Sequence, residues 1–129
     1  MTLSISATYA AALAFYFIAW SFHVSFTRAR TGVRTGDGGN PTMLTAMRQH
    51  GNLAEFMPFA LVMMAFGEAG GLSPLWLHTS GMFLIAGRLI HPFGITNEGG
   101  PIAARAIGQV STYLATLIPA AAILLARLS

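Results

Sequence analysis

Residues 1–27 read MTLSISATYAAALAFYFIAWSFHVSFT, an unbroken run without Asp, Glu, Lys or Arg. A transmembrane helix needs about 20 mostly apolar residues to span roughly 30 Å of hydrocarbon. Because lipid cannot hydrogen-bond a free backbone, a run of this kind is expected to form an α-helix. Basic residues follow the run rather than precede it, unlike the order in a secretory signal peptide. The stretch is therefore predicted to be a retained first membrane span.

Three further stretches of similar length are nearly free of charge: residues 49–67, broken only by Glu55, residues 69–87 and residues 106–126. Proline and glycine clusters separate them and indicate where helices begin and end. The predicted helices span residues 3–28, 42–68, 74–91 and 101–127. The sequence thus predicts an all-α fold, an integral membrane four-helix bundle formed by residues 1–129 as one domain.

Composition supports the same class. The chain is 54% hydrophobic and 9% charged, whereas a soluble domain is roughly 25% charged and a small one must cover much surface with polar groups. There is no cysteine, which excludes disulfides and thiolate metal sites. The four histidines do not share a metal-binding spacing on one helix, so no metal site is predicted. The basic residues are all Arg and are dispersed, which argues against nucleic-acid binding.

The distribution of Arg predicts the orientation in the bilayer. With four spans, the first and third loops lie on one side, and every Arg except Arg127 falls at or near that side. Loops enriched in basic residues stay cytoplasmic. Both termini are therefore expected on the non-cytoplasmic side.

Polar side chains interrupt the apolar helices in a pattern. Arg48, Asn52 and Glu55 are spaced i, i+4 and i+7, so they share one face of the second helix. The corresponding ends of the third and fourth helices carry Arg88, His91, Arg105, Gln109 and Tyr113. If the helices form a bundle, these groups converge at one depth on the Arg-rich side.

Two interpretations of this convergence stay open. Ionisable groups in a membrane helix cost about 2.5–3.5 kcal/mol each and usually face a bundle interior or a wet cavity. Arg48, or an Arg from a neighbouring helix, could pair with Glu55 only to fix packing, while Arg88 and Arg105 reach the headgroups. Alternatively, the set binds a small anionic ligand that carries an ammonium group, such as a peptide.

One run in the second helix resembles a known signature. Residues 48–58 read RQHGNLAEFMP, and this resembles the second-helix signature of the MAPEG family, the membrane-associated proteins of eicosanoid and glutathione metabolism. Residues 87–94, GRLIHPFG, resemble the end of the family's third helix. Residues 36–41, GDGGNP, resemble small bacterial members. The resemblance covers essentially the whole chain.

The resemblance implies a homotrimer in a bacterial inner membrane, with glutathione as co-substrate bound between subunits near the cytoplasmic face. Arg105 matches the fourth-helix Arg credited with activating the thiol, because a guanidinium in a low dielectric favours the thiolate. The implied activity is that of a glutathione-dependent transferase or peroxidase acting on lipophilic electrophiles. The positions that match the family's glutathione contacts are Arg28 or Arg30, Arg48, His50, Asn52, Glu55, Arg88 and His91.

Two departures from the family pattern favour a second hypothesis. Ile95 stands where the eicosanoid synthases have a Tyr, and Phe56 replaces the Tyr that follows the second-helix Glu in some members. One or two hydroxyl contacts to glutathione would be absent. The alternative is a non-catalytic membrane protein that binds lipid or glutathione. A transporter is disfavoured because the helices lack the paired interruptions typical of transporter sites.

Overall fold

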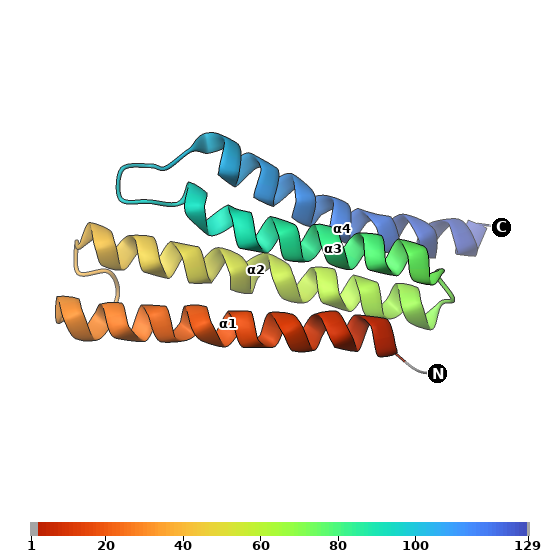
Figure 1. The fold of residues 1–129 in the computed structure, drawn as a ribbon, viewed down its shortest axis with the longest axis horizontal. Helices are drawn as coiled ribbons and strands as arrows, with labels where there is room; N and C mark the ends of the chain where they lie inside the picture. The colour runs from red at the N-terminus through yellow and green to blue at the C-terminus, as the bar shows by residue number, and fades with distance from the viewer. Residues whose placement is uncertain (1–2, 129) are drawn as a thin grey trace.

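A computed structural model describes residues 3–128 of the chain. Figure 1 shows four long helices running side by side along one axis. A short 3-10 helix follows the third of them. The elements are α1 (Ser4–Thr31), α2 (Pro41–Ala69), α3 (Pro74–Ile90), η1 (His91–Gly94) and α4 (Ile102–Leu128). The predicted all-α four-helix fold is confirmed.

Backbone geometry, rather than charge, ends the first helix. α1 continues three residues past the predicted end at Arg28, and Gly32 terminates it in a left-handed conformation with φ 71°. The Gly32 N–H donates to the Arg28 carbonyl at 2.9 Å, which satisfies one of the free helix-end carbonyls. At the start of α2 the Asn40 side chain accepts the Met43 N–H, and Pro41 takes the first helical position.

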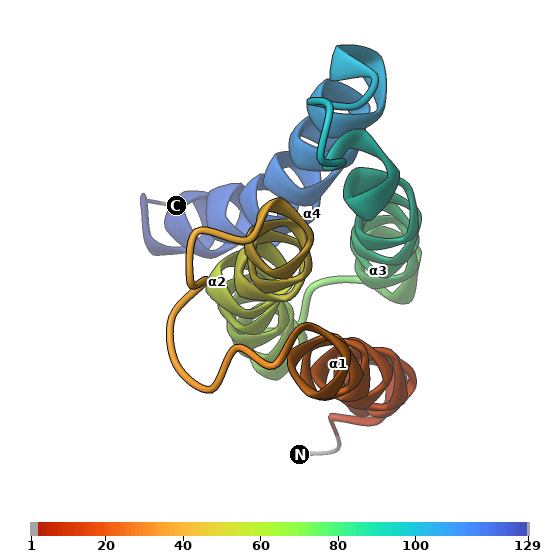
Figure 2. The same ribbon diagram turned by 90° about the vertical axis from the view of Figure 1, so that its left-hand side faces the viewer.

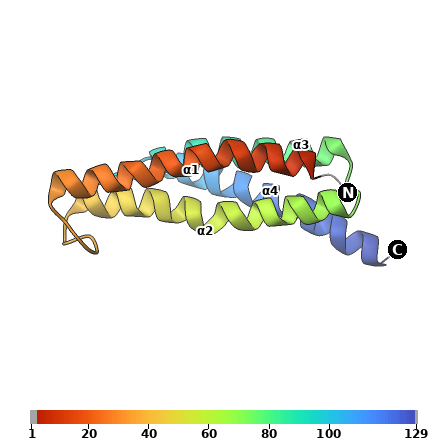
Figure 3. The ribbon, with the colours of Figure 1, turned by 90° about the horizontal axis from the view of Figure 1, so that it is seen from below.

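α2 and α3 each pack against all three other helices. Figure 2, which looks along the bundle, shows α2 between α1 and α4. Figure 3 shows that α4 crosses the bundle obliquely, so that its C-terminal end emerges beside the end of α2. The interior core is thin and contains residues such as Leu13, Leu53, Ala60, Met64 and Leu84.

Glycines bring α3 and α4 into close contact. A Cβ added to Gly87 would lie 2.7 Å from the Gly108 carbonyl oxygen, and one added to Gly108 would lie 2.8 Å from the Gly87 oxygen. Small residues at such a crossing allow two backbones to approach without side chains between them. Further along, a Cβ on Gly94 would lie 2.6 Å from the Arg105 backbone nitrogen. The η1 turn is therefore packed directly against the first turn of α4.

A second close approach joins α1 to α3, and it supports a prediction. Gly81→Ala should lower the free energy of unfolding by about 1–3 kcal/mol, because the added Cβ would come within 2.5 Å of the buried Tyr9 ring. The matched control is Gly51→Ala, also within a helix, where nothing lies within 4 Å of the new methyl group. Chemical unfolding in detergent measures both variants, and equal stability of the two would contradict this packing.

The outer surface of the bundle is strongly apolar. Phe15 is 82% exposed and Phe26 68% exposed on α1, and Leu124 and Leu125 are similarly open on α4. By length and hydropathy, α1 and α4 are long and apolar enough to cross a membrane. α2 carries the polar residues of the candidate site, and α3 is only 17 residues long. An exterior of this kind suits lipid rather than water.

Candidate functional site

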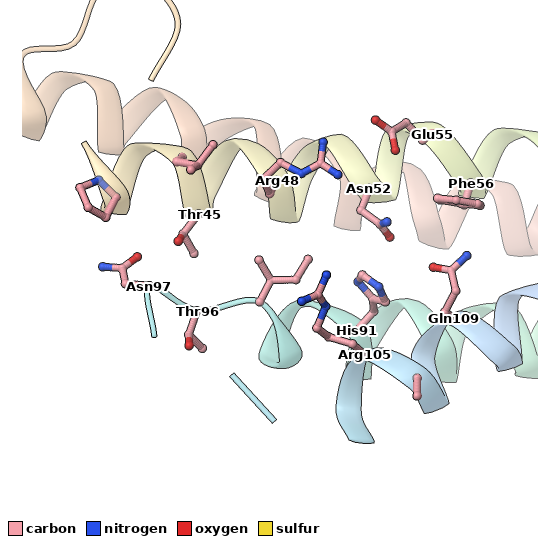
Figure 4. A pocket seen from close by; sticks show the side chains of 14 residues that line it. Thr45, Arg48, Asn52, Glu55, Phe56, His91, Thr96, Asn97, Arg105 and Gln109 are labelled. Carbon is pink, nitrogen blue, oxygen red and sulfur yellow. The ribbon is translucent and has the colours of Figure 1, made fainter. Parts of the chain in front are cut away.

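A cavity of about 670 Å³ opens between α2, η1 and the first turns of α4. Figure 4 shows the side chains that line it. From α2 come Arg48, Asn52, Glu55 and Phe56. The opposite wall is made by His91 and Ile95 and, from α4, by Arg105 and Gln109. Six of the polar residues singled out from the sequence thus meet in one place: Arg48, Asn52, Glu55, His91, Arg105 and Gln109.

Helical spacing explains why these residues meet. The i, i+4, i+7 positions of Arg48, Asn52 and Glu55 place them along one side of α2, and Arg105 and Gln109 are one turn apart on α4. In Figure 4 Asn52 points toward the α4 wall, whereas the Glu55 carboxylate points away from it. The lining residues include two guanidinium groups and one carboxylate. The cavity therefore suits a ligand with net negative charge. Such a ligand would also carry a hydrogen-bonding partner for the Asn52 amide and a positively charged group for the Glu55 carboxylate.

Arg88 lies behind this cavity and has a different role from the one expected. It is only 1% exposed, so the expectation that it reaches the headgroups is wrong. Its Nη1 donates to Asn52 Oδ1 at 2.8 Å and its Nη2 to the Gly108 carbonyl at 3.1 Å. The Tyr16 hydroxyl donates to the Arg88 carbonyl at 2.9 Å. Arg88 therefore ties α1, α2, α3 and α4 together and orients Asn52.

Arg48 and Glu55 do not form the buried ion pair that the sequence suggested. Both side chains are exposed on α2. The Arg that is buried is Arg88, and its side-chain partner is the amide of Asn52. Loss of Glu55 would therefore leave no buried Arg without its partner within one subunit. Glu55 is instead free to meet a ligand or another chain.

The remaining sequence-predicted residues lie away from the cavity. His50 faces α1, where its Nε2 is 2.9 Å from Ser21 Oγ and its ring lies 4.8 Å from that of Phe17. Arg28 donates to the Gly36 carbonyl at 2.9 Å and so holds the loop between α1 and α2. Arg30 is exposed on α1. One subunit alone does not bring these three residues to Arg48 and Arg105.

Sequence reasoning missed residues that shape the cavity from the loop between α3 and α4. Gln49 Nε2 donates to the Pro92 carbonyl at 3.1 Å and to the Ile95 carbonyl at 2.8 Å. Asn97 Nδ2 donates to Thr42 Oγ1 at 3.1 Å. These bonds hold the loop against the start of α2. The sequence signal for these contacts was the presence of Gln49 and Thr42 on the same helix as Arg48, Asn52 and Glu55.

An apolar groove of about 420 Å³ adjoins the cavity and shares Glu55 and Phe56 with it. Its other walls are Phe59, Tyr113 and Leu117, together with Thr116. Phe59 is 61% exposed and Leu117 60% exposed, so the groove opens sideways between α2 and α4. A polar cavity and an apolar groove are therefore continuous along one face of the bundle.

Comparisons with known proteins show the family of the chain. The sequence profile of the MAPEG family matches residues 6–125. The chain belongs to the MAPEG family. It is 40% identical over 90 residues to the inner membrane protein YecN of Escherichia coli strain K12, a match that covers 70% of this chain and 69% of YecN. YecN of Escherichia coli O6:H1 matches to the same extent. No solved structure matches the chain.

MAPEG membership makes this chain a membrane helical bundle, in a family whose members include glutathione-dependent enzymes. Membership of this family also explains the apolar exterior, because lipid rather than water surrounds a membrane bundle. The two departures from the family pattern lie at the cavity itself. Ile95 and Phe56 both line it, and neither supplies a hydroxyl group.

Proposed function

We propose that this MAPEG protein binds glutathione in the cavity between Arg48 and Arg105 and transfers it to lipophilic electrophiles. The observation that carries the proposal is the convergence of two guanidiniums, an amide and a carboxylate next to an apolar groove. The peptide would occupy the polar cavity. The electrophile would enter from the lipid through the groove lined by Phe59 and Leu117.

The polar groups match the ends of the tripeptide. Glutathione carries two carboxylates and one ammonium group, and the Arg48 guanidinium can hold one carboxylate through paired, charge-assisted hydrogen bonds. Glu55 offers the only carboxylate among the residues lining the cavity and suits the ammonium group. The Asn52 side chain, whose oxygen is engaged by Arg88, keeps its amide N–H groups for a peptide carbonyl.

Arg105 is the residue proposed to activate the thiol. A thiol of ordinary pKa is mostly protonated near neutrality, and the thiolate is the nucleophile. A nearby guanidinium stabilises the thiolate, and the thiol proton passes to water. The sulfur then forms a bond to the electrophilic carbon, and the leaving group departs with its bonding electrons. The Arg105 guanidinium can support the anion by donating hydrogen bonds and through its charge.

We further propose that the protein works as a homotrimer with the cavity facing the cytoplasm and both termini on the opposite side. The uneven distribution of Arg supports this orientation. The open cavity supports assembly, because a second subunit could close it and bring exposed groups such as Arg30 toward it. Arg28, on α1, and His50, on α2, belong to the same pair of packed helices as Arg30. They would approach the cavity of the neighbouring subunit together with Arg30.

Two measurements on purified protein test the proposal. Isothermal calorimetry should detect glutathione binding, and a generic aryl halide should be conjugated at a rate above the uncatalysed reaction. Arg48→Ala should weaken glutathione binding about tenfold or more, because a charge-assisted hydrogen bond contributes roughly 1.5–3 kcal/mol. Arg34→Ala, an exposed Arg outside the cavity, is the control. Absence of binding in the wild type, or equal affinities in the two variants, would rule out this site.

A second candidate function is favoured by Ile95 and Phe56. With no hydroxyl at either position, the protein would bind glutathione or a lipid without catalysis. Ultraviolet absorbance of the bound thiolate distinguishes the two functions. A thiolate signal near neutral pH is expected for the transferase, whereas bound glutathione that stays protonated would favour the binding protein.

A further inference from the structure

A second cavity, of about 820 Å³, lies at the opposite end of the bundle from the glutathione site. It is formed by the last turns of α2, the turn into α3 and the last turns of α4. In Figure 1 this is the end at which both chain termini lie. α4 runs obliquely across the bundle toward this end (Figure 3), and Arg127, in its last turn, lines the cavity.

The polar groups that line this cavity include hydrogen-bond donors and one positive charge, and they include no carboxylate. Arg127 contributes its guanidinium. Trp76 contributes an indole N–H, and the Ser73 hydroxyl makes no capping bond to α3. Every other Arg in the sequence lies between residues 28 and 105, so Arg127 stands apart from the Arg-rich end. This set of donors is suited to a phosphate.

The nearest acid is turned away from the cavity. Glu68 is the next-to-last residue of α2, but its two carboxylate oxygens accept the Ile5 and Ser6 N–H groups at 2.9 and 2.8 Å. The carboxylate thereby caps the first turn of α1, which has no cap of its own. Glu68 is committed to α1, and the described residues that line the cavity include no other acid to neutralise Arg127.

The other walls are apolar and continue toward the membrane interior. Phe66, 61% exposed, and Met63 line one side, and Ile123 lines the other. Trp76 is 52% exposed at the rim, and Trp is enriched at the level of lipid headgroups. A free anion would gain nothing from this apolar surface, whereas an acyl chain would bury it.

We propose that this cavity binds an anionic phospholipid. The phosphate meets Arg127, with Ser73 and Trp76 beside it. The acyl chains lie along Phe66 and Ile123. The site is at the other end of the bundle from Arg105 and shares no lining residue with the glutathione cavity. Either the proposed lipid site or the proposed glutathione site can therefore be disproved without affecting the other proposal.

Native mass spectrometry of the purified full-length protein, titrated with phosphatidylglycerol or phosphatidylcholine, tests the proposal. A basic residue near a headgroup contributes about 1 kcal/mol with anionic lipids, so the wild type should retain phosphatidylglycerol about fivefold more strongly. Arg127→Gln should abolish this preference, and Arg127→Lys should largely keep it. Arg34→Gln, which removes an exposed Arg at the opposite end, should leave it unchanged.

Three outcomes would overturn the proposal. The first is equal retention of the two lipids by the wild type, or an unchanged preference in Arg127→Gln. The second is full competition by inorganic phosphate, which would assign the site to a soluble anion. The third is loss of subunits in Arg127→Gln, which would make the surface a contact between copies of the chain. Chemical unfolding of Arg127→Gln in detergent, compared with the wild type, checks that the variant is folded.

Discussion

Arg105→Ala should reduce glutathione conjugation by at least about 100-fold. This is the usual effect of removing one group that stabilises a developing anion in an enclosed site. Arg105 lines the cavity opposite Arg48, and the packing of Gly94 against its backbone fixes its position. Without its guanidinium the thiol of bound glutathione would stay protonated near neutrality. The expected loss is therefore in turnover rather than in affinity.

The measurement compares the conjugation rate and the thiolate absorbance of wild type, Arg105→Ala and Arg105→Lys. Lys keeps the charge but not the planar fork of donors, so part of the rate and of the absorbance should return. Calorimetry on Arg105→Ala should still detect bound glutathione through Arg48 and Glu55. A full rate in Arg105→Ala would remove Arg105 from the mechanism, and an unchanged thiolate absorbance would place the activation of the thiol at another residue.

Arg88→Met should cause the largest loss of stability, about 3 kcal/mol, because it removes two charge-assisted hydrogen bonds at a buried position. Asn52 Oδ1 loses its donor, whereas the Gly108 carbonyl oxygen keeps the Thr112 hydroxyl, which donates to it at 2.9 Å. Arg88 is 1% exposed, so water cannot replace the missing donors. Unfolding in detergent measures the change, and Arg30→Met, at an exposed position on α1, is the control.

A double variant separates the bond to Asn52 from simple loss of volume. When both partners of a buried polar pair are replaced by apolar groups of similar shape, the penalty of an unpaired group disappears. Arg88→Met combined with Asn52→Leu should therefore be more stable than Arg88→Met alone. Additive losses would show that Arg88 acts only through packing. Glutathione affinity should fall in both, because Asn52 is no longer held toward the cavity.

The helices could be predicted from the sequence because their signals are local. The uncharged run of residues 1–27 and the three later stretches are each long enough for a span, and membrane helices satisfy their own backbone. The face that carries Arg48, Asn52 and Glu55 follows from helical spacing alone. The charge pattern predicts the end of α1 at Arg28, three residues too early. The helix ends instead where Gly32 adopts the left-handed conformation.

The partners of the charged groups were decided only by the tertiary structure. Nothing in the spacing distinguishes Arg88, buried against Asn52, from Arg48, which is exposed. That difference depends on the close approach of Gly87 to Gly108, which draws α3 and α4 together and encloses the Arg88 side chain. The uncharged run thus determined by itself that the chain forms membrane helices. Which of their few charges face a ligand depends on how closely the helices pack, because burial is a property of neighbours distant in the sequence.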